Sequence, residues 1–139
     1  MSKRFRGYIS SRYFMGERVP QHVQNIVLRN YCNQRNYQFF LSASEYTMNN
    51  SYIILKKTID DISNLDGILA YSIFQMPYKD IERMSLFRKI LKLNKVIHFA
   101  VEDLAVKNNE TLEKVEILWK IRKSIDFSIK DFNSIKEIF

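Results

Sequence analysis

The stretch FRGYISSR, residues 5–12, decides how the rest of the chain is interpreted. Its apolar residues predict a β-strand over residues 5–10, and the polar residues after it predict a loop. Pro20 then opens a helix, because the N–H that proline lacks has no partner in a first helical turn. Apolar residues recur through this helix with the spacing of one buried face, at Val23, Ile26, Val27 and Tyr31.

The same alternation of strand and helix continues to the end of the chain. Further strands are predicted over residues 37–41, 68–73 and 96–101, with helices that begin near Asn49 or Asn50, after Pro77, and at Asn108 or Asn109. Such alternation is typical of a parallel sheet with right-handed crossovers. We therefore expect a doubly wound α/β fold, flavodoxin-like or resolvase-like, with a mostly parallel sheet of four or five strands flanked by helices.

Two segments follow from this pattern. Residues 1–125 are predicted to form a single α/β domain, which suits a chain of 139 residues with 46% hydrophobic content. Residues 126–139 are predicted to form a C-terminal helical tail, whose spaced apolar residues suit a contact with this domain, with a second copy or with a partner. We expect a homo-oligomer on this ground.

Composition limits the classes of site and compartment. Cys32 is the only cysteine, so no internal disulfide is possible, and with His22 and His98 it falls short of a structural zinc site. We expect neither a metal nor a cofactor. No apolar run approaches the roughly 20 residues that cross a bilayer, and no signal peptide is visible. We expect a cytoplasmic protein with no membrane span.

The net charge of +7 has two interpretations. It indicates an anionic partner, or it reflects a solvated surface rich in lysine. Lysine and arginine are scattered, without an arginine-rich run or a repeat of aromatic and basic residues. We therefore expect an anionic small molecule, such as a sugar phosphate or nucleotide sugar, and do not expect nucleic acid.

Polar residues follow each predicted strand, where ligands bind in open α/β sheets. Arg12 can hold a carboxylate or phosphate through two parallel hydrogen bonds, and the helix near Pro20 would direct its positive end to the same place. The loop matches no Walker or dinucleotide motif, because it lacks their glycines and lysine. Strands end in polar loops in any protein with a solvated surface, which is the alternative explanation. The predicted ligand-binding residues are Ser10, Ser11, Arg12, Gln21, Arg29, Ser42 and Tyr46.

Three residues are candidates for proton transfer. His22 stands in the first turn of the first predicted helix, and its charge can change near neutral pH. Glu45 and Glu102 follow strands, and paired carboxylates in different environments can divide acid and base roles. A surface histidine and carboxylates that cap helices are the alternatives. A metal site that combines these residues with Asp103 is conceivable, but no recognisable spacing supports it.

Four stretches carry a resemblance to a known family: residues 7–12, 19–25, 29–32 and 41–46. With them the chain resembles, to about Trp119, the "sporadic carbohydrate cluster" proteins of bacteria, which are encoded among genes for surface polysaccharides. The resemblance implies a role in making or modifying a surface glycan, without naming a reaction.

A second resemblance concerns the opening of the chain. Residues 7–12, followed by Gln21 and Gln24, are similar to the start of serine-recombinase catalytic domains, in which a Gly-Tyr strand leads to an arginine and a nucleophilic serine. Here Ser10 stands where that arginine belongs and Arg12 where that serine belongs. Residues 72–77 replace the later Asp-Arg…Arg segment. The resemblance implies the fold, but without those arginines nothing would stabilise the charge of phosphoryl transfer.

These observations lead to one expected function and two alternatives. We expect a small bacterial enzyme or enzyme subunit in surface-carbohydrate biosynthesis that acts on an anionic sugar or nucleotide-sugar intermediate, its reaction type left open. The first alternative is a non-catalytic binding or assembly module of the same pathway. The second is a degenerate recombinase-like domain that binds DNA.

Overall fold

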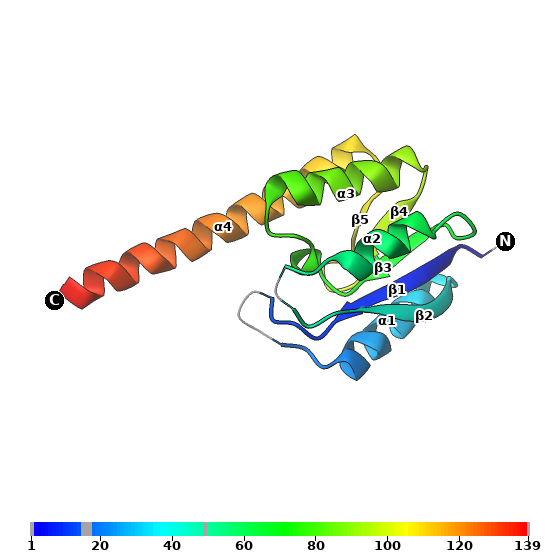
Figure 1. Ribbon diagram of the computed structural model, residues 1–139, viewed down its shortest axis with the longest axis horizontal. Coiled ribbons are helices and arrows are strands. Elements are labelled where there is room, and N and C mark those ends of the chain that lie inside the picture. Colours follow the sequence, from blue (N-terminus) through cyan, green and yellow to red (C-terminus); the bar gives the residue numbers. More distant parts are fainter. Residues whose placement is uncertain (1, 15–17, 49, 139) are drawn as a thin grey trace.

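Strands and helices alternate along nearly the whole chain (Figure 1). The computed structural model describes residues 2–14, 18–48 and 50–138, with side chains as far as Ser128. The elements in chain order are β1 (Arg4–Ser10), α1 (Gln21–Arg35), β2 (Gln38–Glu45), α2 (Ile53–Asp60), β3 (Gly67–Ala70), the 3₁₀ helix η1 (Ile73–Gln75), α3 (Asp80–Lys92), β4 (Val96–Phe99), β5 (Leu104–Val106) and α4 (Asn109–Ile138).

One five-stranded sheet runs through the molecule in the order β2-β1-β3-β4-β5. The first four strands are parallel, and β5 pairs antiparallel with β4 at one edge. The predicted α/β fold with a mostly parallel sheet is therefore confirmed. The carboxyl ends of β1, β2 and β3 lie at the same edge of the sheet, together with the loops that follow them.

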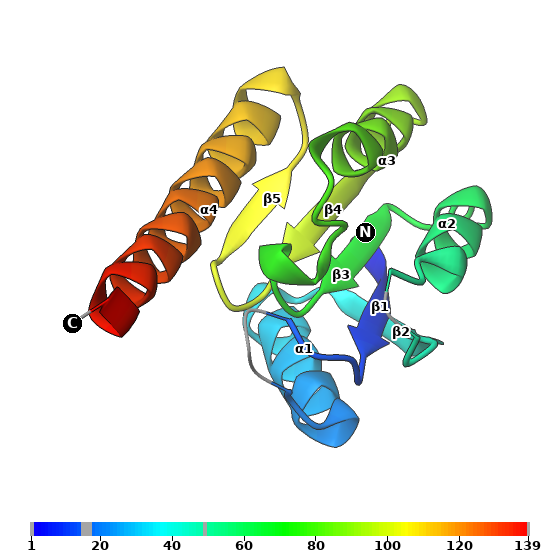
Figure 2. The ribbon, with the colours of Figure 1, turned by 60° about the vertical axis from the view of Figure 1, so that its left-hand side comes forward.

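Helices cover both faces of the sheet (Figure 2). On one face α1 packs with a small core that includes Phe5, Leu28 and Cys32. On the other face α2, α3 and the first part of α4 pack with a larger core around Ile68 and Phe87. All four residues of β3 are buried because the strand lies in the middle of a sheet covered on both sides.

Strand β2 is longer than the sequence predicts, because a bulge lets it continue beside β1. Arg6 pairs with Phe40, but Tyr8 pairs with Ala43, so β2 gains one residue over this step, and pairing continues to Ser10 and Glu45. Residues 42–45, which lie beyond the predicted end of this strand, are thus part of the sheet. Gly7 lies at the bulge, where a Cβ atom would overlap Ser42 Oγ and approach the ring of Phe39 to 2.9 Å.

Strand β3 is shorter than predicted, since residues 71–73 leave the sheet. The Ser72 hydroxyl accepts a hydrogen bond from the N–H of Phe74, and Gln75 Oε1 accepts one from the N–H of Ser72, which forms a capping box for η1. After β4 the chain turns at Asp103, with φ of 53°, and returns as β5.

Residues 126–138, predicted as a separate tail, continue α4 without a break. The second half of this helix extends away from the rest of the molecule (Figure 1). In the described part of the chain, no helix has the length and apolar character that would let it cross a membrane.

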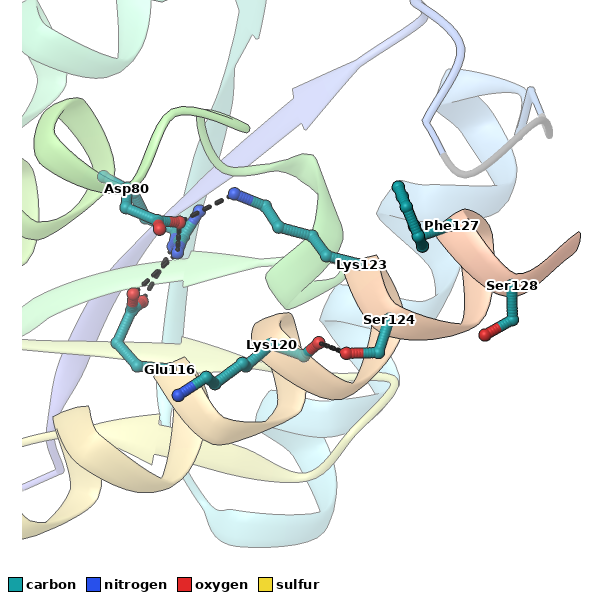
Figure 3. A pocket seen from close by; sticks show the side chains of 8 residues that line it. Asp80, Glu116, Lys120, Lys123, Ser124, Phe127 and Ser128 are labelled. Atoms are coloured by element: carbon teal, nitrogen blue, oxygen red, sulfur yellow. Dashed lines mark hydrogen bonds and ion pairs between the residues drawn. The ribbon is translucent and has the colours of Figure 1, made fainter. Parts of the chain in front are cut away.

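A pocket of about 540 Å³ has Asp80, Glu116 and Lys123 in its lining (Figure 3). The side chain of Arg83 also lines this pocket and fastens α4 to α3. Its guanidinium is 1% exposed and donates two hydrogen bonds to Glu116, at 2.7 and 2.6 Å, and one to Asp80 at 2.7 Å. Lys123 donates to the same Asp80 oxygen at 2.7 Å. Hydrogen bonds from Lys123 and Arg83 lower the pKa of Asp80 and keep it charged.

Candidate functional site

Gln24 joins the loop after β1 to its neighbours through a buried set of hydrogen bonds. Its Nε2 donates to the carbonyl oxygens of Ser10 and Val19, at 2.6 and 2.8 Å. Its Oε1 accepts from the N–H of Ser10 at 3.2 Å and from Gln75 Nε2 at 2.9 Å. Because Gln24 is fully buried, these bonds fix α1, β1 and η1 relative to one another.

Arg12 lies beneath the surface, 7% exposed, between loops that are distant in the sequence. Nη1 donates to the carbonyl of Ser51 and Nη2 to the carbonyl of Gln75, the latter at 3.0 Å. The guanidinium also stacks on Tyr52, with Cζ 4.1 Å from the ring centre. Two of its donors are therefore already used within the protein.

The carboxylate of Glu45 caps the N-terminus of helix α2. It accepts hydrogen bonds from the backbone N–H groups of Ile54 and Leu55, both at 3.0 Å, and from the Tyr8 hydroxyl at 2.9 Å. A carboxylate at this position satisfies unpaired N–H groups and interacts favourably with the helix dipole. Burial raises the pKa of Tyr8, so its hydroxyl stays protonated and donates. The predicted proton-transfer role of Glu45 stays a prediction.

Glu102 makes the corresponding contacts at the start of η1. It accepts from the Ser72 hydroxyl and from the N–H of Ile73, each at 2.8 Å. Glu45 and Glu102 thus serve different helices. Within the described residues, no group of three or more His, Cys, Asp or Glu side chains could hold a metal ion.

The two histidines lie in different environments. His22 is exposed on α1, whereas His98 is packed among the rings of Phe5, Tyr31 and Tyr37. The Tyr31 hydroxyl lies 2.8 Å from His98 Nδ1. Burial, aided by nearby positive charge, lowers the pKa of His98 to about 4, so the imidazole is neutral at physiological pH. Burial also raises the pKa of the Cys32 thiol to about 11.

The other predicted binding residues have different surroundings. Ser10 is buried and its hydroxyl accepts from the N–H of Arg12 at 3.3 Å, while Ser11 and Gln21 are half-buried. The Ser42 hydroxyl donates to Asn25 Oδ1 at 2.6 Å on the β2 side of α1. Tyr46 and Arg29 are exposed. Their assignment to a ligand stays a prediction.

A cavity of about 370 Å³ opens beside Arg12 at the carboxyl edge of the sheet. We call it the aromatic cavity, because six of its ten lining residues carry aromatic rings. Its lining consists of Arg12, Tyr13, Phe14, Asn50, Tyr52, Phe74, Gln75, Met76, Tyr78 and Trp119. Trp119 is 1% exposed and contacts Phe74 edge to face, with ring centres 5.2 Å apart.

Two guanidinium groups flank the outer strand of the sheet, β2. Arg29, from α1, lies with Cζ 5.9 Å from the ring of Phe39, and Arg6, from β1, lies with Cζ 5.9 Å from the ring of Phe40. Neighbouring residues of a strand point to opposite faces, so these arginines lie on the two sides of β2. We call β2 with Arg6 and Arg29 the basic edge.

The sequence pattern does not identify the residues that organise this region. Gln24 belongs to a motif and Gln75 is one of the polar residues after the third predicted strand, while Tyr52 and Trp119 fall outside the predicted site. The predicted buried face of α1 is wrong at Ile26, which is 63% exposed, because the helix turns toward the sheet the face that carries Gln24, Leu28, Tyr31 and Cys32. No local pattern links residues from four separate loops and helices.

Comparisons with known proteins give one kind of match. No protein-family model matches the chain, and no curated protein matches it. A solved resolvase family site-specific recombinase from Streptococcus pneumoniae is similar with a TM-score of 0.62 and 9% sequence identity, over 96% of this chain and 98% of that one. The N-terminal catalytic domain of TP901-1 integrase is similar with a TM-score of 0.61 and 14% identity, over 91% and 98%. At these identities the likeness shows the fold.

The expected role in surface-carbohydrate biosynthesis is wrong. The matching structures are recombinase and integrase domains, and no comparison supports the carbohydrate-cluster family or a sugar partner. The stretches behind that resemblance lie in and around β1, α1 and β2, where Gln24 and Glu45 make contacts within the protein. The resemblance to serine recombinases is confirmed for the fold, and the expectation against nucleic acid no longer stands.

Proposed function

We propose that this chain is a nucleic-acid-binding domain with the resolvase fold, which contacts duplex DNA through the basic edge and does not carry out recombination. The observation that carries the proposal is the pair of guanidinium groups on either side of the outer strand. Arg29 is exposed, and Arg6 is half-buried with Nη1 donating to the carbonyl of Leu41 at 2.9 Å. Arginine side chains are suited to phosphate oxygens of a nucleic-acid backbone.

The distribution of charge along the chain supports this edge as the contact surface. Residues 1–48 contain seven lysines and arginines against two acidic residues, Glu17 and Glu45, and so account for five of the seven net positive charges. Glu45 is 3% exposed and already bonded, so its charge is largely compensated inside the protein. Lys3, Arg4 and Arg18 are exposed in the same third of the chain.

The arrangement around β1 argues against a recombinase nucleophile. Serine attack on a phosphate needs an accessible hydroxyl and cationic groups around the phosphate. Ser10 is 1% exposed, and Arg12 is held by two backbone carbonyls. Residues 72–77 follow β3 and contain no arginine, although the recombinase resemblance would require arginines there.

Binding to a fluorescently labelled 24-base-pair duplex, followed by anisotropy from 50 to 300 mM salt, tests the proposal. Two or three phosphate contacts predict that the logarithm of affinity falls with the logarithm of salt with a slope of about −2 to −3. Arg29→Glu should weaken binding about tenfold and reduce the slope. The matched control is Arg88→Glu, because Arg88 is an exposed arginine on α3. Equal binding by wild type and Arg29→Glu would contradict the proposal.

We also propose that a second copy of the chain packs on α4. Ile117, Ile121 and Ile125 are 56%, 52% and 46% exposed and recur every four residues, which places them on one face of the helix. The sequence continues this spacing with Ile129. Since the second half of α4 extends beyond the rest of the molecule, and isolated helices are marginal in water, a second copy would stabilise it.

A further inference from the structure

The aromatic cavity has the size and lining of a small-molecule site, and the basic edge does not use it. Its volume of about 370 Å³ is in the range of ligand pockets. Arg12 is the only charged residue among the ten that line it. A ligand that combines a flat apolar ring with polar or anionic groups would suit such a lining.

The aromatic rings of the cavity differ in how far other groups of the protein already cover them. Trp119 has the guanidinium of Arg83 over its ring, with Cζ at 4.3 Å, and Tyr52 has that of Arg12 at 4.1 Å. These faces are occupied within the protein. Tyr78 also lines the cavity and is 54% exposed, but Lys123 Nζ lies 4.2 Å from its ring centre, so one face of that ring is contacted within the protein. Tyr13 lines the cavity too and is 68% exposed, so its ring is the one accessible for stacking.

Planar hydrogen-bonding groups accompany these rings. Asn50, exposed in the loop before α2, has a left-handed backbone with φ of 60°, and its amide makes no hydrogen bond to the described residues. The Arg12 guanidinium has five N–H groups, of which two donate to the carbonyls of Ser51 and Gln75. Amide and guanidinium planes match the donors and acceptors along the edge of a nucleobase.

We propose that the aromatic cavity binds one unpaired nucleobase, stacked on Tyr13 with its polar edge toward Asn50 and Arg12. Base stacking on aromatic side chains is a general means of holding single-stranded nucleic acid. A base within a duplex is already stacked and paired, so it does not enter. The base can belong to a single strand or to a free nucleotide, which share this chemistry. The inference does not depend on duplex binding, since it uses none of the basic edge.

Trp119 provides the measurement, because it is the only tryptophan in the chain and lines the cavity. Its fluorescence would be followed while dTMP, AMP, ribose 5-phosphate, a (dT)₁₂ strand or a 12-base-pair duplex is added, with calorimetry as a second readout. We expect saturable changes with dTMP or AMP and with (dT)₁₂, and none with ribose 5-phosphate or the duplex. Tighter binding of (dT)₁₂ than of dTMP identifies a strand as the source, and equal binding identifies a free nucleotide.

Substitutions separate the cavity from the rest of the surface. Tyr13→Ala and Asn50→Ala should each weaken binding of dTMP at least fivefold, whereas Phe127→Ala, which removes an exposed aromatic ring outside the cavity, should not. Circular dichroism melting verifies that each variant is folded. Equal binding of ribose 5-phosphate and AMP, no binding of any base up to 10 mM, or unchanged affinity in both cavity variants would overturn the inference. Arg29→Glu should alter duplex binding alone, so failure of one proposal is distinguishable from failure of the other.

Discussion

Arg12, Gln24 and Glu45 are buried polar side chains that hold the loops at the carboxyl edge of the sheet. A buried polar group is costly unless it is hydrogen-bonded, and these three donate to or accept from backbone groups of neighbouring loops. These hydrogen bonds therefore fix the loops at the carboxyl edge of the sheet in a chain that contains only three glycines. The same contacts explain why these residues, conspicuous in the sequence, lie inside the protein.

His98 makes the stability of the protein depend on pH. Its pKa is about 4 in the folded chain, against 6.5 for an unperturbed histidine. Between these values the unfolded chain binds a proton that the folded chain does not, so the free energy of unfolding falls as pH falls from 6.5 toward 4. The loss is on the order of 3 kcal/mol at most. Urea unfolding at pH 7 and pH 4.5 measures it.

The variant His98→Asn gives the control for this prediction. An asparagine keeps a hydrogen-bonding group near Tyr31 but does not titrate in this range. The variant should therefore lose less stability than wild type between pH 7 and pH 4.5, while carboxylates contribute equally to both. Equal losses in the two proteins would contradict the assignment to His98.

The surroundings of Arg12 show which part of a site can be predicted from sequence. The sequence predicts that Ser10, Ser11 and Arg12 follow the first strand, and the fold agrees. The groups that bind the guanidinium come from Ser51 and Gln75, which are 39 and 63 residues away in the chain. Periodicity describes neighbours along one element, so it carries no information about such long-range contacts.

At the scale of elements, periodicity predicted the four parallel strands and the helices, and it failed where an element is short or irregular. Strand β5 and the helix η1 have three residues each, which is too few for a period to appear. The extension of β2 depends on a bulge opposite Gly7, a feature set by pairing with β1 and not by the residues of β2 alone.

The attachment of α4 depends on Arg83. We expect Arg83→Met to lower the free energy of unfolding by about 3 kcal/mol, because it leaves Glu116 partly buried without its partner. The pair with Asp80 should contribute little, since that carboxylate is 66% exposed. The measurement is urea denaturation followed by circular dichroism.

Arg88 provides a matched control on the same helix, because its side chain is exposed. Arg88→Met should change stability by no more than about 0.5 kcal/mol. If the two variants were equally stable, Arg83 would not be the anchor that its contacts indicate.

At the scale of the whole molecule, the proposed dimer contact and the proposed duplex contact would lie on opposite sides. The order of strands places β2 at one edge of the sheet and β5, which contacts α4, at the other. A copy bound along α4 would leave both basic edges uncovered. The two proposals are therefore compatible with one assembly.

The proposed pairing predicts the effect of one substitution on α4. Ile121→Lys places a charge in the middle of the exposed isoleucine face and should convert dimers to monomers, as measured by size exclusion with light scattering. Ile81→Lys on α3 is the control, since Ile81 is 87% exposed and lies outside that face. A mass that stays that of a dimer in Ile121→Lys would remove α4 as the contact.

Because Cys32 is buried, the rate at which its thiol reacts can serve as a measure of local opening. Its thiol is 1% exposed, and its pKa of about 11 leaves very little thiolate at neutral pH. Alkylating reagents can therefore reach it only when the core between α1 and the sheet opens, and the rate of labelling reports that opening. A cysteine introduced on the surface would react first, so cross-linking and spin labelling can proceed with the native thiol in place.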